Sequence, residues 1–142
     1  MSTQDKLYGS WRLLRTFKTV DGEITDRFPL GQSPYGYIHY VPDGRVSVLI
    51  AYDGRKPVRD PSSDAEVAAN ARKFVAYGGT FTVERDDFVV HHLDITTLEN
   101  DRGTDYPRTM EFEGNTLTLG TPVVETPEGR IGMKLVWEKV AG

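Results

Sequence analysis

The sequence predicts a mainly β fold, a closed antiparallel barrel of eight strands with one inserted α-helix. Three observations lead to this fold class. Segments rich in aromatic and β-branched residues recur along the chain, and several alternate apolar and polar residues with the two-residue period of a strand. Short turns containing glycine or aspartate separate them, which is typical of neighbouring antiparallel hairpins. A single segment shows a helical pattern instead.

Five stretches account for the eight expected strands. The first begins at Gly9 and ends at the turn dipeptide Asp21-Gly22, which predicts one long strand. Each of the next three contains a strand, a short turn and a second strand, and the alternation is strictest over 46–50. In chain order the stretches are GSWRLLRTFKTV (9–20), GYIHYVPDGRVSVLIAY (36–52), TFTVERDDFVVHHLDITTL (80–98), RTMEFEGNTLTLGTP (108–122) and RIGMKLVWEKV (130–140).

The exception is SDAEVAANARKFVAY (63–77), whose pattern predicts an α-helix between the third and fourth long strands. Ser63 and Glu66 have the spacing of a capping box. Gly78-Gly79 would end the helix, because glycine is common just after a helix C-terminus. A helix would place four apolar residues on one face, namely Val67, Ala71, Phe74 and Val75.

Eight antiparallel strands either close into a barrel or divide into a two-layered sandwich. Closure removes the exposed sheet edges, and eight strands leave room for packed side chains or for one small ligand. We therefore expect a barrel, with a sandwich as the alternative. No internal repeat, low-complexity segment or linker interrupts the 142 residues, so we expect a single domain over 1–142.

Composition and charge exclude several functional classes. The formal net charge is −4, whereas a nucleic-acid-binding domain usually presents a basic face. The chain contains no cysteine, which excludes disulfides, thiolate metal sites and a cysteine nucleophile. Neither an apolar signal segment nor an apolar run long enough to cross a membrane occurs. We therefore expect a cytoplasmic protein that binds neither nucleic acid nor membrane.

Several segments resemble those of a known family. GSW (9–11), at the start of the first long strand, resembles the G-x-W signature of lipocalins. With YGYIHYVPDGR, VVHH and LVWE following in this order, the region over about 7–140 is similar to the bacterial and fungal lipocalin-like domain family. The resemblance implies a calycin-type barrel with a central cavity and an inserted helix, but no single activity. One departure is Lys139, because lipocalins often pack an arginine of the last strand across the signature tryptophan.

Alternation assigns the side chains of each strand to one face or the other, because successive residues point to opposite sides. The inner faces are mostly apolar with a few polar groups, which is how small-molecule sites are usually built. Arginines near strand ends and tyrosines in a core can also have a purely structural role. The candidate ligand contacts are Arg15, Phe17, Ile38, Val48, Tyr52, Phe81, Val89, Leu93, Met110, Phe112, Met133 and Leu135.

The adjacent histidines of DFVVHHLDI (87–95) are expected on opposite faces. His91 belongs to the more apolar set of its strand and so points inward, whereas His92 points outward, although a register slip of one residue would exchange them. Two adjacent strand residues cannot chelate one ion without a bulge, and the inner faces lack carboxylates, so we expect no metal site. The sequence also lacks a G-x-S-x-G motif and a glycine-rich phosphate loop, and we expect no cofactor.

Three functions remain open. The first is binding of a small, mostly apolar ligand with an acidic or carbonyl end in the barrel cavity. The second is a cofactor-independent isomerase, cyclase or lyase, in which His91 acts as acid or base and Arg108 and Tyr40 support it. The third is a fully packed barrel that acts as a protein-interaction domain. The sequence makes no prediction of ligand identity or oligomeric state.

Overall fold

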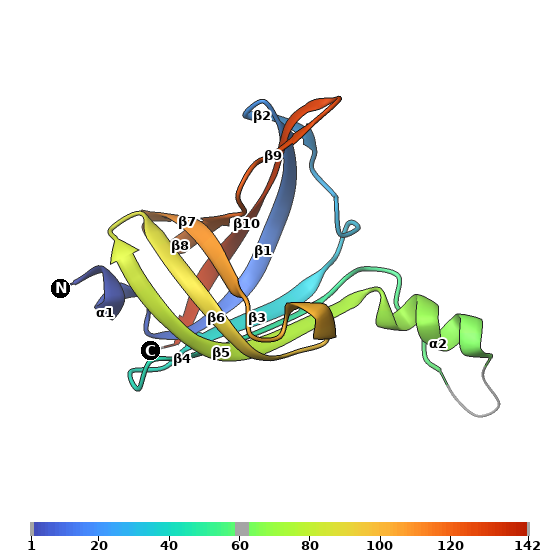
Figure 1. Ribbon diagram of the computed structural model, residues 1–142, viewed down its shortest axis with the longest axis horizontal. Helices are drawn as coiled ribbons and strands as arrows, with labels where there is room; N and C mark the ends of the chain where they lie inside the picture. The colour runs from blue at the N-terminus through green and yellow to red at the C-terminus, as the bar shows by residue number, and fades with distance from the viewer. Residues whose placement is uncertain (1, 59–62, 142) are drawn as a thin grey trace.

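Eight strands form a closed antiparallel barrel, as the sequence predicts (Figure 1). The computed structural model describes residues 2–58 and 63–141 and contains ten strands within this part of the chain. Of these, β2 and β9 are short extensions outside the barrel. The strands are β1 (Gly9–Val20), β2 (Glu23–Asp26), β3 (Tyr35–Tyr40), β4 (Arg45–Ala51), β5 (Phe74–Arg85), β6 (Phe88–Thr96), β7 (Asp105–Glu113), β8 (Thr116–Gly120), β9 (Val124–Thr126) and β10 (Gly129–Ala141).

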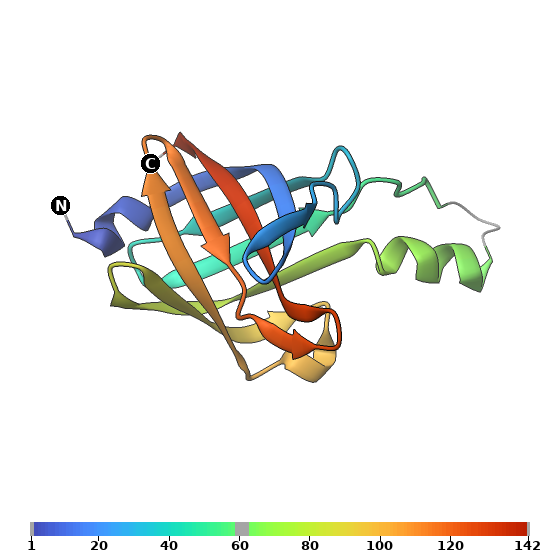
Figure 2. The same ribbon diagram turned by 90° about the horizontal axis from the view of Figure 1, so that it is seen from above.

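The barrel closes because β1 pairs with β10 along almost its whole length, from Ser10 opposite Ala141 to Val20 opposite Ile131. On its other side the start of β1 pairs with β3, and the remaining strands follow as neighbours in chain order up to β8, which pairs with β10. Figure 2 shows the strands wrapping around a common interior. Pairing of both sheet edges resolves the choice between barrel and sandwich in favour of the barrel.

The expected turn at Asp21-Gly22 is present, but it leads into β2, which the sequence analysis did not predict. Asp21 and Gly22 have φ angles of 51° and 84°, and positive φ at both central residues is typical of a two-residue hairpin. The Asp21 carboxylate accepts a hydrogen bond from the Arg130 backbone N–H at 2.9 Å. This bond connects the β1–β2 hairpin to the hairpin formed by β9 and β10.

The inserted helix α2 (Asp64–Ala71) is shorter than predicted. Ser63 and Glu66 form the expected capping box, in which Ser63 Oγ accepts from the Glu66 N–H at 3.2 Å. The prediction that the helix extends to residue 77 is wrong, because β5 begins at Phe74 and pairs with the end of β4. Ladder hydrogen bonds to a neighbouring strand therefore override the local helical pattern of this segment.

The predicted apolar face of the helix does not form either. No residue of α2 is buried, and Val67 is 50% exposed. In Figures 1 and 2 the helix projects away from the barrel rather than covering a face of the sheet. The helix therefore contributes no residue to the core.

Gly78-Gly79 lies within β5 and does not end a helix. The pairing of β5 with β6 is irregular between these two glycines. A Cβ atom on Gly79 would lie 1.7 Å from the carbonyl oxygen of His92 on the neighbouring strand. Glycine is required here because the two backbones approach too closely for any side chain.

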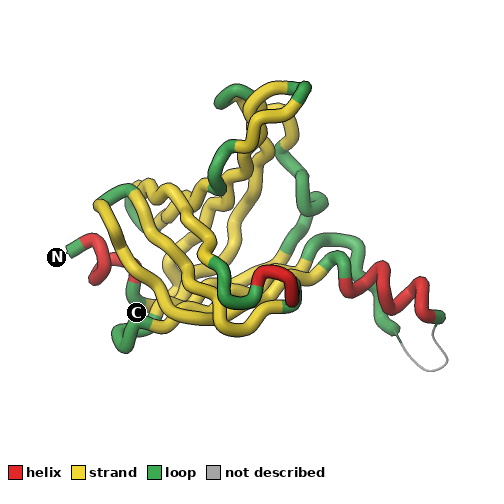
Figure 3. The backbone as a smooth tube through the Cα atoms, viewed as in Figure 1, coloured by secondary structure: helices red, strands yellow, loops and turns green. Residues whose placement is uncertain are grey.

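The two ends of the barrel differ. The short helix α1 (Thr3–Leu7) lies at the end that carries the β5–β6 and β7–β8 turns (Figure 3). Its Leu7 is fully buried. The opposite end carries the loop with the 3₁₀ helix η1 (Glu99–Asp101) and the connection to α2. A helix able to cross a membrane is absent from the described residues.

Candidate functional site

The barrel contains a cavity of about 250 Å³ in the half of the interior that lies away from α1. Its volume is just below the range of about 300–1,000 Å³ that is typical of small-molecule pockets. Most of its wall is aliphatic or aromatic, and the polar groups are few. The lining residues are Leu30, Ile38, Val48, Ile50, Tyr52, Val75, Tyr77, Leu98, Tyr106, Arg108, Leu119, Thr121, Met133, Leu135 and Trp137.

Arg108 is the charged residue in the cavity wall. It lies on β7, where Tyr106, Arg108 and Met110 alternate toward the interior, and it pairs with the fully buried Val89. Its guanidinium lies over the Tyr106 ring, 4.9 Å from the centroid, and Nη1 donates to the Pro107 carbonyl at 2.8 Å. Among the described residues, no carboxylate lies within 4.0 Å of it.

His91 is buried behind the cavity wall, with 1% of its surface exposed. Both ring nitrogens contact tyrosine hydroxyls: Nε2 lies 2.7 Å from Tyr40 Oη, and Nδ1 lies 2.6 Å from Tyr77 Oη. Burial is the main cause that lowers the pKa of His91 to about 3, and the nearby charge of Arg108 lowers it further. The imidazole is therefore neutral at pH 7.

The two tyrosines that contact His91 are also neutral at pH 7. Burial raises the pKa of both Tyr40 and Tyr77 above the ordinary value, although the positive charge of Arg108 acts in the opposite direction. Tyr77 packs edge-on against Tyr106, with ring centroids 5.2 Å apart. Together these groups form a buried polar cluster that meets the cavity at Tyr77, Tyr106 and Arg108.

A family model described as a lipocalin-like domain matches residues 8–140, nearly the whole chain. The chain belongs to the lipocalin-like domain family. Membership supports binding of small molecules in general, and it identifies neither a ligand nor a reaction. A comparison with curated proteins finds no significant match.

The lipocalin-like barrel brings part of the sequence-predicted set to the cavity. His91 points inward, as alternation predicts, whereas His92 lies on the outer face, where Nδ1 is 2.8 Å from an Asp105 carboxylate oxygen. Arg108 also faces inward as predicted. The candidate ligand contacts that line the cavity are Ile38, Val48, Tyr52, Met133 and Leu135.

The predicted inward orientation of Arg15 and Phe17 is wrong. The pairing of β1 with β10 shifts between Leu13 and Arg15, so a β-bulge at this point reverses the alternation. Thr16 occupies the interior with 2% exposure, while Arg15 is exposed. Phe17 contacts Arg27, whose guanidinium is 5.7 Å from the ring centroid. Strand alternation cannot reveal a bulge, because the extra residue depends on the partner strand.

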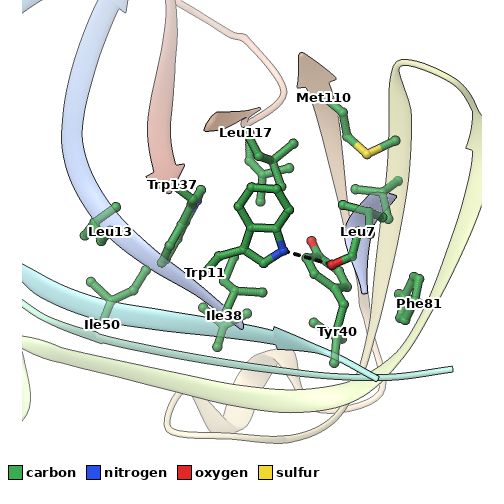
Figure 4. Packing of buried hydrophobic residues seen from close by; sticks show 14 of the residues in the cluster. Leu7, Trp11, Leu13, Ile38, Tyr40, Ile50, Phe81, Met110, Leu117 and Trp137 are labelled. Atoms are coloured by element: carbon green, nitrogen blue, oxygen red, sulfur yellow. Dashed lines mark hydrogen bonds between the residues drawn. The ribbon is translucent and has the colours of Figure 1, made fainter. Parts of the chain in front are cut away.

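The remaining candidates belong to the packed half of the lipocalin-like barrel and do not line the cavity. In this half, Trp11 donates its indole N–H to the Leu7 carbonyl at 2.8 Å (Figure 4). Lys139 lies over the Trp11 ring, 4.7 Å from the centroid, and donates to the carbonyls of Lys6 and Tyr8. The candidates in this packed half, none of which lines the cavity, are Tyr40, Phe81, Val89, Leu93, Met110 and Phe112.

Tyr77 is among the cavity-lining residues that the sequence analysis missed. The helical pattern of 63–77 predicts a helix up to this residue, so the strand alternation does not extend to it. The signal was available in FVAYGGTFTV, because Phe74 to Val83 reads as one apolar, β-prone run. Continuing the inward phase of Phe81 back by two and four residues reaches Gly79 and Tyr77.

The described residues contain no group of three or more histidine, aspartate or glutamate side chains arranged to hold a metal ion. His91 reaches the cavity through the hydroxyl of Tyr77, because its own ring does not line the wall. Its role as an acid or base stays a prediction. The protein-interaction alternative requires a fully packed interior. The cavity shows that the interior is not fully packed.

Proposed function

We propose that the barrel binds a small, mostly apolar molecule whose carboxylate or carbonyl end meets Arg108. The observation that carries this proposal is the position of Arg108 in the cavity wall without a carboxylate within 4.0 Å among the described residues. A guanidinium has five N–H donors, and the recorded hydrogen bond to Pro107 uses one of them. A partly buried cation in an apolar wall gains most from an anionic partner.

The rest of the wall supports an apolar body for this ligand. Leu30, Ile50, Leu119 and Leu135 present hydrocarbon to the cavity. Each square ångström of apolar ligand surface that they cover contributes about 25 cal/mol. A volume of about 250 Å³ limits the ligand to a short aliphatic chain or a single ring with a short chain.

The test compares 4-phenylbutyrate with 4-phenylbutan-1-ol, which have the same apolar body and differ in the charged end. Binding is measured by titration calorimetry and by fluorescence of Trp137, which lines the cavity. Arg108→Met should weaken carboxylate binding about 10- to 100-fold, because a hydrogen bond to a charged group contributes about 1.5–3 kcal/mol. Binding of the alcohol should change little.

Arg15→Met is the matched control, because Arg15 lies on the same barrel but is exposed on its outer face. This variant should bind both compounds as the unmodified protein does. Equal affinities of the unmodified protein and Arg108→Met for 4-phenylbutyrate would contradict the proposal. Native mass spectrometry of the purified protein would then show whether a co-purifying molecule carries a different polar group.

A further inference from the structure

Three buried side chains form a continuous hydrogen-bonded chain from the packed half of the barrel to the cavity. Tyr40 is 2.7 Å from one nitrogen of His91, and Tyr77 is 2.6 Å from the other. Tyr40 and His91 are each 1% exposed and do not line the cavity, whereas Tyr77 does. The chain is therefore sealed at the Tyr40 end and open at the Tyr77 end.

The protons of this chain can be arranged in two ways. A neutral imidazole has one N–H donor and one acceptor nitrogen, and each tyrosine hydroxyl has one proton to donate. Burial and the charge of Arg108 lower the pKa of His91 to about 3, so the neutral ring is the relevant form at pH 7. One tyrosine must therefore donate to His91, and the other must accept from it.

The sealed end decides between the two arrangements. If His91 donated from Nε2, the Tyr40 proton would have to find another acceptor, and His91 is the one partner recorded for this hydroxyl among the described residues. If Tyr40 donates to Nε2, the Nδ1–H of His91 donates to Tyr77 Oη. The one proton without an internal acceptor is then that of Tyr77, at the cavity wall. The first arrangement leaves the Tyr40 donor unpaired where the cavity does not reach it, which is strongly unfavourable, whereas the second leaves only the Tyr77 donor, which a ligand in the cavity can reach.

We propose that Tyr40 fixes His91 in the Nδ1–H tautomer and so makes the Tyr77 hydroxyl a hydrogen-bond donor toward the cavity. This inference rests on the proposed function and specifies the ligand atom. The atom that meets Tyr77 is an acceptor, a carboxylate or carbonyl oxygen, and not an N–H group. Tyr77 is then a ligand-binding residue beside Arg108, and Tyr40 is a positioning residue that acts through His91.

The tautomer can be observed without any ligand. In ¹⁵N-labelled protein, two-bond ¹H–¹⁵N correlations distinguish protonated from unprotonated ring nitrogens. At pH 7 we expect His91 to show a protonated Nδ1 and an unprotonated Nε2. Tyr40→Phe should shift both nitrogens toward intermediate values, because the donor to Nε2 is gone. Tyr37→Phe, on the outer side of the same strand, should leave them unchanged.

A protonated Nε2 at His91 in the unmodified protein would overturn the inference, whether or not Tyr40→Phe folds. Ligand binding provides the second measurement. Tyr77→Phe should weaken the binding of 4-phenylbutyrate about 10- to 100-fold, because the lost hydrogen bond is made to a charged group. It should not weaken the binding of butylbenzene, which has the same apolar body and no polar end. If Tyr77→Phe binds the carboxylate unchanged while Arg108→Met does not, the inference fails and the proposed function stands.

Discussion

Lowering the pH should destabilise the fold through His91. In the unfolded chain this histidine binds a proton with a pKa near 6.5, whereas burial lowers its pKa to about 3 in the fold. Between these two values the unfolded state binds a proton that the folded state does not. The contribution of the neutral His91 to the stability of the fold is therefore fully present above pH 6.5 and is lost as the pH falls from 6.5 toward 3.

The magnitude follows from the two pKa values. Each pH unit between them is equivalent to about 1.4 kcal/mol, so the whole difference is on the order of 5 kcal/mol. Between pH 7.5 and pH 5, before most carboxylates titrate, His91 should contribute a loss of about 2 kcal/mol. That is a substantial part of the 5–15 kcal/mol that is typical of a folded domain.

Urea unfolding followed by tryptophan fluorescence at pH 7.5, 6.5, 5.5 and 5.0 measures this loss. His91→Gln removes the titration but keeps an amide that can hydrogen-bond to Tyr40 and Tyr77. Its stability should vary with pH by about 2 kcal/mol less than that of the unmodified protein. His39→Gln is the matched control, because His39 lies on the outer side of β3 beside Ser10 and should preserve the full loss.

Two results would refute this reasoning. The first is the same pH dependence of unfolding in His91→Gln as in the unmodified protein. The second is a movement of the Cε1 proton resonance of His91 in the folded protein between pH 7.5 and pH 5, where we expect none. A titration midpoint near 6.5 would mean that the buried ring accepts a proton in the folded state.

Two further substitutions test the packing that surrounds the site. Gly79→Ala should destabilise the fold by more than about 3 kcal/mol, since its Cβ would lie 1.7 Å from a carbonyl oxygen of β6. Gly103 has a positive φ, but a Cβ added there would have no neighbouring atom within 4 Å. Gly103→Ala should therefore lower the free energy of unfolding in urea by only about 1–2 kcal/mol. Lys139→Met should lower stability by about 1–2 kcal/mol, because the carbonyl of Tyr8 loses its donor. The same change at the exposed Lys134 of β10 should stay within about 0.5 kcal/mol, and equal effects at both lysines would contradict this account.

Sequence patterns predicted the barrel well where a strand has one buried face. The alternation of β4 and β6 placed Val48, Val89 and His91 in the interior, because side-chain direction along a regular strand depends only on local geometry. The same reasoning failed at Arg15, where a bulge reverses the alternation, and over residues 74–77, where pairing with β4 gives strand instead of the expected helix. Both exceptions depend on the partner strand.

The sequence by itself determined the fold class, the family and the inward direction of His91 and Arg108. These follow from periodicity and segment order, which are local properties of the chain. The tertiary structure alone decided where the interior is filled and where it is open. Leu7 and Trp11 fill the end beside α1, while the cavity lies beyond them next to Tyr77 and Arg108. The reason is that packing depends on side chains from distant segments, and no single stretch of sequence contains that information.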